Sequence, residues 1–207
     1  MKFIILLLIF SLLSFLNATN APIEIQSIRF DKVKVGKYDW TQIEVKLFAN
    51  ASFSSKTLVQ RNSKYLDDIE MCLYLCYDNR NQKTKDFYKS TVKIVSIEKG
   101  VANYAYFYIP GIVVERDRLD KTPFAWMADF NISGNKIPND PKKFKNNFSS
   151  RLNSLSLVES FLSNLEEGIQ KNEGILLPIY LAPNGVRGKA SNLNKLVLYH
   201  RLDPVME

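Results

Sequence analysis

The stretch Gly100–Pro110 reads GVANYAYFYIP and places Tyr104, Tyr106 and Tyr108 at every second position. Side chains two residues apart on a β-strand point to the same face, so this spacing predicts one row of tyrosine rings. The alternate positions form a row typical of a core face: Val101, Asn103, Ala105, Phe107 and Ile109. The stretch therefore predicts a strand with two apolar faces. Its tyrosine row is either covered by another layer of the protein or free to bind a ligand.

The same alternation of apolar and polar residues continues on both sides of this strand. It covers residues 23–35, 39–50, 66–78, 87–100 and 122–136, with Gly36 and Gly134 at turns. A break at Gln26 and Ser27 indicates a β-bulge. About seven short strands with almost no helix between them predict a mainly β fold, an antiparallel immunoglobulin-like β-sandwich over residues 22–138. Another all-β packing, such as a small barrel, stays open as the alternative.

The composition changes after residue 138. Residues 136–154 are rich in Pro, Lys, Asn and Ser and are typical of a linker, with Phe144 and Phe148 as anchors onto the sandwich. An amphipathic helix follows, with Ser156 and Glu159 as a capping box and Gly168 at its C-terminal cap. Its apolar stripe consists of Leu157, Val158, Phe161, Leu162 and Leu165. Residues 139–207 are thus predicted to be a linker, one C-terminal helix and an extended tail that pack on the sandwich.

The chain begins with MKFIILLLIFSLLSFLNATNA, which has the pattern of a secretory signal peptide over residues 1–21. Lys2 supplies a basic start, and the apolar run Phe3–Leu16 has fourteen residues, fewer than the roughly 20 that span a bilayer. Cleavage is expected after Ala18 or Ala21, and an uncleaved N-terminal anchor is the alternative. We expect an exported protein, periplasmic or extracellular, with no transmembrane span in the mature chain.

The net charge and the two cysteines indicate which partners the protein can bind and whether it forms a disulfide. The mature chain carries 27 basic and 21 acidic residues, a balance of +6, and the basic residues are scattered, so no nucleic-acid partner is expected. Cys72 and Cys76 lie on one face of one predicted strand, about 13 Å apart. A disulfide needs Cα atoms within about 7 Å, so two free, buried thiols are predicted.

No pattern of residues predicts catalysis, a cofactor or a metal. His200 is the only histidine, which is too few for a zinc site or a catalytic triad. Asp78, Asn79 and Asn81 could supply calcium ligands, but a hairpin loop explains them better. A pair of facing carboxylates, as a hydrolase needs, stays possible. The acids available for such a pair are Asp67, Asp68, Glu115, Asp117, Asp129, Glu166 and Glu167.

Four segments together resemble a known group of proteins: KVKVGKYDW, LDDIEMCLYLCY, ANYAYFYIPGIVVERDR and GILLPIYLAP. They are similar to exported β-sandwich proteins encoded beside type IV pilus assembly genes in Gram-negative bacteria. The resemblance implies an immunoglobulin-like fold and a role in pilus or envelope assembly. It implies no enzymatic residues, and residues from 184 onward have no counterpart in it.

The candidate binding residues are the tyrosine row, Tyr104, Tyr106 and Tyr108, and two arginines of the charge cluster VVERDRLD, Arg116 and Arg118. The charges of that cluster are expected to pair around a loop. The arginines could also form a docking rim, because Arg and Tyr are enriched at interfaces. The sequence thus predicts a non-catalytic assembly or adhesion module that binds envelope or pilus proteins. The alternatives are a carbohydrate-binding sandwich that uses the tyrosines, and a carboxylate-dependent hydrolase. For the row itself, we expect the helix or the GILLPIYLAP segment to cover the rings.

Overall fold

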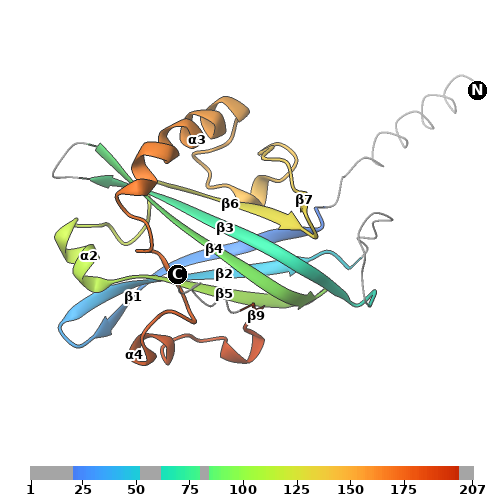
Figure 1. Ribbon diagram of the computed structural model, residues 1–207, viewed down its shortest axis with the longest axis horizontal. Coiled ribbons are helices and arrows are strands. Elements are labelled where there is room, and N and C mark those ends of the chain that lie inside the picture. Colours follow the sequence, from blue (N-terminus) through green and yellow to red (C-terminus); the bar gives the residue numbers. More distant parts are fainter. Residues whose placement is uncertain (1–20, 52–61, 80–83, 201–207) are drawn as a thin grey trace, which may run out of the picture.

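A computed structural model describes residues 21–51, 62–79 and 84–200 (Figure 1). The predicted signal peptide lies outside these residues, apart from Ala21, and so does Asn81 of the possible calcium loop. The described residues form two antiparallel sheets with three helices around them. This arrangement confirms the predicted mainly β sandwich.

The two sheets contain four and five strands. The first has the order β1 (Ile23–Val35), β2 (Tyr38–Ala49), β5 (Ala102–Ile109) and β8 (Leu177–Pro178). The second has the order β7 (Asn135–Lys136), β6 (Ala125–Ile132), β3 (Tyr65–Asn79), β4 (Thr84–Glu98) and β9 (Leu198–Tyr199). Seven strands come from the predicted sandwich region, and the two short strands β8 and β9 come from the tail.

The strand order is immunoglobulin-like. An immunoglobulin constant domain places its first, second, fifth and fourth strands in one sheet and its third, sixth and seventh in the other. Here β1, β2 and β5 share a sheet, while β3, β6 and β7 share the other. The difference is β4, which pairs with β3 instead of joining the first sheet. The small-barrel alternative is therefore wrong.

The main core lies between the sheets and follows the alternation in the sequence. Ile43 and Val45 of β2, Leu73 of β3 and Phe107 of β5 are all fully buried in it. The β1–β2 hairpin turns at Gly36, whose φ of 62° lies in the left-handed region that favours glycine. The register of β1 against β2 shifts between Ile25 and Ser27, which confirms the predicted bulge.

Helix α3 (Leu155–Gln170) packs on the outer face of the second sheet (Figure 1). Its buried residues Val158, Phe161 and Leu165 contact that sheet, and the ring of Phe161 meets the ring of Phe87 edge-on at 5.5 Å. The helix cap predicted at Ser156 is wrong, because the side chain of Ser154 accepts the hydrogen bond from the Leu157 amide. Leu157 was predicted to belong to the apolar stripe, but it is 45% exposed and lies outside it.

Gly168 lies inside α3 and does not cap it, which corrects a second prediction. The helix continues to Gln170. A Cβ atom added at Gly168 would lie 2.4 Å from Cδ2 of Phe87. A glycine is therefore required here because the helix approaches β4 closely, and not because the chain turns.

The segments on either side of α3 also pack on the sandwich. Residues 139–154 include the short 3-10 helix η2 (Lys145–Asn147), and Asn147 and Phe148 are buried. After α3, the tail runs from β8 through α4 (Asn184–Arg187) and η3 (Leu193–Lys195) to β9. It therefore begins at the edge of the first sheet and ends at the edge of the second. A short helix missed by the sequence analysis, α2 (Gly111–Arg116), follows β5.

Among the residues that the structure describes, no helix has the length and apolarity needed to cross a membrane.

Candidate functional site

The tyrosine row is buried beneath the tail. Tyr106 and Tyr108 have no exposed surface, and Tyr104 is half-buried. The residues that cover the row come from the tail: Ile179, Ala182, Val186, Ala190 and Leu196. The expectation of a covering segment is met by the tail, whereas α3 lies on the other sheet. A platform of two or more open tyrosine rings for carbohydrate is excluded in this fold, because Tyr106 and Tyr108 have no surface that a sugar could reach.

A buried carboxylate fastens the tail to the first sheet. Glu44 of β2 accepts hydrogen bonds from Tyr106 Oη at 2.6 Å, Ser191 Oγ at 3.0 Å and Asn192 Nδ2 at 3.1 Å. The backbone amide of Asn192 also donates a hydrogen bond to Tyr106 Oη at 3.0 Å. Burial, and then the Glu44 carboxylate, raise the pKa of Tyr106. We call Glu44, Tyr106, Ser191 and Asn192 the tail clamp, since they join the tail to β2 and β5.

The two candidate arginines lie at the end of α2 in different environments. Arg116 Nη2 contacts Asp117 Oδ2 at 2.7 Å, and this hydrogen bond raises the pKa of Arg116. Asp117 is held from the other side by Tyr88 Oη, which donates to it at 3.3 Å. Arg118 has a φ of 49° and lines a shallow pocket with Lys32 and Glu115. The structure therefore shows one of the predicted charge pairs, Arg116 with Asp117. Tyr106 and Tyr108 have no exposed surface with which to extend a docking rim beside the arginines.

Cys72, Cys76 and Asp129 lie on the outer face of the second sheet. Cys72 and Cys76 are free and buried, and burial raises the pKa of Cys76 to about 11. Cys72 Sγ accepts a hydrogen bond from Thr91 Oγ1 at 3.2 Å. Asp129 lies 3.5 Å from Lys136 Nζ, and burial raises its pKa. In the described part of the chain, no group of three or more His, Cys, Asp or Glu residues could hold a metal.

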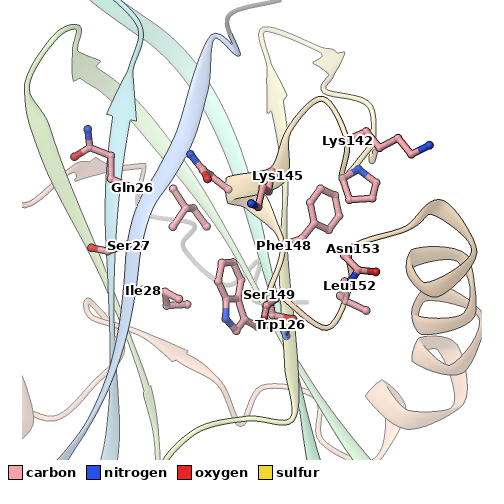
Figure 2. Close-up of a pocket in the computed structure, with 14 residues that line it drawn as sticks. Gln26, Ser27, Ile28, Trp126, Lys142, Lys145, Phe148, Ser149, Leu152 and Asn153 are labelled. Carbon is pink, nitrogen blue, oxygen red and sulfur yellow. Dashed lines mark hydrogen bonds between the residues drawn. The ribbon is translucent and has the colours of Figure 1, made fainter.

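An open cleft of about 690 Å³ lies beside β1 on one side of the sandwich. Its walls are the bulged part of β1, Trp126 of β6, and the segment from Pro141 to Asn153. Figure 2 shows Ile28, Trp126, Phe148 and Lys145 gathered in the space between β1 and β6, while Lys142 points outward. The volume lies within the range of roughly 300–1,000 Å³ typical of ligand pockets.

Hydrogen bonds hold the wall opposite β1 in place. The amide of Ser149 donates to the carbonyl of Trp126 at 2.9 Å, and the amide of Trp126 donates to Ser149 Oγ at 3.2 Å. On the β1 side, the amide of Ile25 donates to Asn147 Oδ1 at 3.3 Å. This bond shows that the Ile25 amide points away from β2, toward the free edge of the sheet. The segment around η2 therefore crosses the edge of β1 at Ile25 and leaves the next residues open to the cleft.

The lining combines apolar side chains with positive charge. Ile25, Phe148 and Leu152 are buried in its walls, and Ile28 and Trp126 are half-buried. The polar lining residues are serines, asparagines, one glutamine and two lysines, with no carboxylate, imidazole or thiol. The cleft can therefore bind a ligand through apolar contacts, amide and hydroxyl hydrogen bonds, and attraction for negative charge.

Sequence reasoning did not find this cleft. Two of its signals were visible, namely the break in alternation at Gln26–Ser27 and the two phenylalanines among lysines. The break marks the bulge, and Phe148 anchors the opposite wall. What could not be read from the sequence is that residues 141–153 return to lie beside β1, more than a hundred residues away.

Comparisons with known proteins show the fold. No protein-family model matches the chain, and no curated protein matches it. A crystal structure of a protein from Akkermansia muciniphila is similar, with a TM-score of 0.60 and 15% sequence identity. The match covers 86% of this chain and 92% of that chain. At such low identity the similarity indicates a shared β-sandwich over nearly the whole length of both chains.

Proposed function

We propose that this protein is an exported, non-catalytic module of the bacterial envelope that binds another envelope protein. An association with type IV pili is the most specific form of this proposal. It rests on the resemblance of four sequence segments to proteins encoded beside pilus assembly genes. The immunoglobulin-like fold that this resemblance implies is the observed fold.

The observation that carries the binding function is the open cleft beside β1. A buried apolar wall containing Phe148 and Leu152 faces the edge of a strand whose other edge is paired with β2. Soluble proteins usually cover such strand edges or place charges on them. An uncovered edge beside apolar side chains is a feature that a protein partner can use.

The chemistry of the lining favours binding over catalysis. General acid–base catalysis at neutral pH usually relies on histidine or on paired carboxylates. The cleft instead presents Trp126, Lys145 and the amides of Asn146 and Asn153. Tryptophan is enriched in surfaces that recognise proteins, where it often supplies a main part of the binding energy.

A matched pair of substitutions tests this function in the native bacterium. Asn153 is exposed and lines the cleft, so Asn153→Trp should fill it. Asn194 is exposed on η3, outside the cleft lining, so Asn194→Trp adds the same bulk at an unrelated position. Each variant would complement a strain lacking the gene, with surface pili counted by electron microscopy and protein levels checked by immunoblot.

We expect the deletion strain to lose pili, Asn194→Trp to restore them and Asn153→Trp to fail. Equal rescue by both variants at equal protein level would show that the cleft is not the functional surface. Normal pili in the deletion strain would show that the pilus role is wrong.

Export is tested separately on the same cells. Mass spectrometry of the native protein should find its N-terminus at Thr19 or Pro22, because cleavage is expected after Ala18 or Ala21. An intact Met1 on a membrane-bound form would support the uncleaved anchor instead.

A further inference from the structure

The edge of β1 carries charges along most of its length but not where it borders the cleft. Beyond the bulge, Arg29, Lys32 and Lys34 are exposed, and lysines of this kind protect strand edges from pairing. Between Ile25 and Ile28 the side chains are uncharged. The one part of the edge without a charged side chain is therefore the part that the cleft leaves accessible.

The cleft lies at an opening between the two sheets. Ile28 and Trp126 are partly buried and pack against the main core, although they belong to different sheets. Phe148 and Leu152 belong instead to the smaller core beneath α3. An apolar side chain placed between these residues would join the two cores and exclude water from both. A strand presents such side chains at every second position, so an extended segment fits the cleft.

The positive charge of the cleft lining favours acidic residues on a bound extended segment. Lys142 and Lys145 are exposed, and none of the fourteen lining residues is acidic. In Figure 2 the amine of Lys145 points into the space between β1 and β6. Neither lysine has an ion-pair partner among the described residues. A carboxylate on the bound segment would therefore meet a positive charge that forms no ion pair with the described residues. The acid near Lys145, Glu24, instead accepts a hydrogen bond from the side chain of Asn146.

We propose that the cleft binds an extended acidic–apolar segment of a partner protein, which adds to the edge of β1 beside the bulge. Its backbone pairs with β1, alternate apolar side chains enter between Ile28 and Trp126, and a carboxylate lies against Lys145. This inference rests on the proposed function and adds the class of partner. Strand addition supplies affinity through backbone hydrogen bonds, and the cleft supplies specificity through its side chains.

A displayed library of random ten-residue peptides tests this chemistry with the purified full chain. Selection uses the wild-type protein, and counter-selection against Asn153→Trp removes peptides that bind elsewhere. The enriched peptides should share two apolar residues spaced two apart, at least one Asp or Glu, and no run of prolines. A synthetic copy of the most enriched peptide is then measured by fluorescence polarisation, beside a twin with its acid replaced by Lys.

Two charge variants complete the test. Lys145→Glu should weaken binding of the acidic peptide about threefold to tenfold and improve binding of its lysine twin. Lys189 is exposed and lies outside the cleft lining, so Lys189→Glu should change neither affinity. Single proline replacements at two neighbouring peptide residues should differ sharply. The one whose amide donates to β1 should abolish binding, and the one whose amide faces away should be tolerated, because proline removes a backbone donor and is accepted only on the free side of an edge strand.

Several results would overturn the proposal. Enrichment of basic or proline-rich peptides, or no enrichment above Asn153→Trp, contradicts an acidic strand. Binding of a glycan array that Asn153→Trp abolishes would assign the cleft to carbohydrate. Concentration-dependent self-association that Asn153→Trp abolishes would assign it to a second copy of the chain. The pilus experiment can fail while peptide selection succeeds, so errors in the cellular role and in the partner class are distinguishable.

Discussion

The hydroxyl of Tyr106 donates a 2.6 Å hydrogen bond to the carboxylate of Glu44, directly across the β2–β5 ladder. Both residues are buried, and the same carboxylate oxygen accepts hydrogen bonds from Ser191 and Asn192 of the tail. Arg29 lies 3.7 Å from the other oxygen. These hydrogen bonds and the nearby arginine offset the cost of burying the Glu44 carboxylate.

Tyr106→Phe should destabilise the protein by about 1–3 kcal/mol, because it removes a charge-assisted hydrogen bond and leaves the Asn192 amide without its acceptor. Tyr108→Phe on the same strand is the matched control. Its hydroxyl is buried and has no hydrogen-bond partner among the described residues, so its removal should be neutral or slightly stabilising. Urea unfolding of both variants measures the difference. Equal losses of stability would mean that the tail clamp contributes nothing specific.

Phe161→Ala should cost about 3–5 kcal/mol, the usual effect of truncating a buried phenylalanine. Phe161 is buried against Phe87, whereas Leu157 on the same helix is 45% exposed. Leu157→Ala should therefore change the free energy of unfolding by less than about 1 kcal/mol. Thermal unfolding followed by circular dichroism compares the two variants. An unchanged midpoint for Phe161→Ala would show that α3 does not depend on this contact with the second sheet.

Gly168→Ala should be destabilising by about 1–3 kcal/mol even though alanine favours helices. The added methyl group would lie 2.4 Å from Cδ2 and 3.2 Å from Cβ of Phe87, so the ring or the helix must move. Gly188→Ala is the control, since its φ is −64° and the nearest atom to the added carbon is 3.6 Å away. That change should be neutral or stabilising. Denaturant titration separates them, and a stabilised Gly168→Ala would mean that α3 sits farther from β4.

The two thiols should react slowly in the native protein and fully after denaturation, without any reductant. Both are buried, and a pKa of about 11 leaves the Cys76 thiolate scarce at neutral pH. Alkylation followed by mass spectrometry should show two added groups in denaturant and few in native buffer. A mass two hydrogens below that of the dithiol form, with no labelling, would reveal a disulfide and contradict the strand assignment of Cys72 and Cys76.

Stability should fall as the pH rises above about 10. Burial raises the pKa of Tyr108 to about 12, above the value near 10 that an unfolded tyrosine has. The unfolded chain then loses this proton at lower pH than the folded chain. Below pH 10 the ionisation of Tyr108 has no effect on stability, and between about pH 10 and 12 the folded state loses stability relative to the unfolded chain. The loss between these pH values should be smaller in Tyr108→Phe, as urea unfolding at each pH would show; an identical loss would contradict the raised pKa.

The sequence by itself determined the sandwich, because one strand after another alternates and each buries the face that its apolar residues require. It determined the bulge at Gln26–Ser27 and the core face of the tyrosine strand for the same reason. It placed the helix, but it misplaced both caps. Several Ser residues precede the helix and fit a cap equally well, and the close approach of Phe87 to Gly168 involves a strand eighty residues away.

Only the tertiary structure decided what covers each outer face and where a partner can bind. Glu44 alternates as a solvent-facing residue in the sequence, yet the tail buries it and supplies its hydrogen bonds. The sequence left open whether the tyrosine row is covered or exposed. It is covered because residues 176–199 pack over it. The cleft depends on residues 141–153 returning to the edge of β1. Contacts between such distant segments depend on chain topology, which local periodicity does not encode.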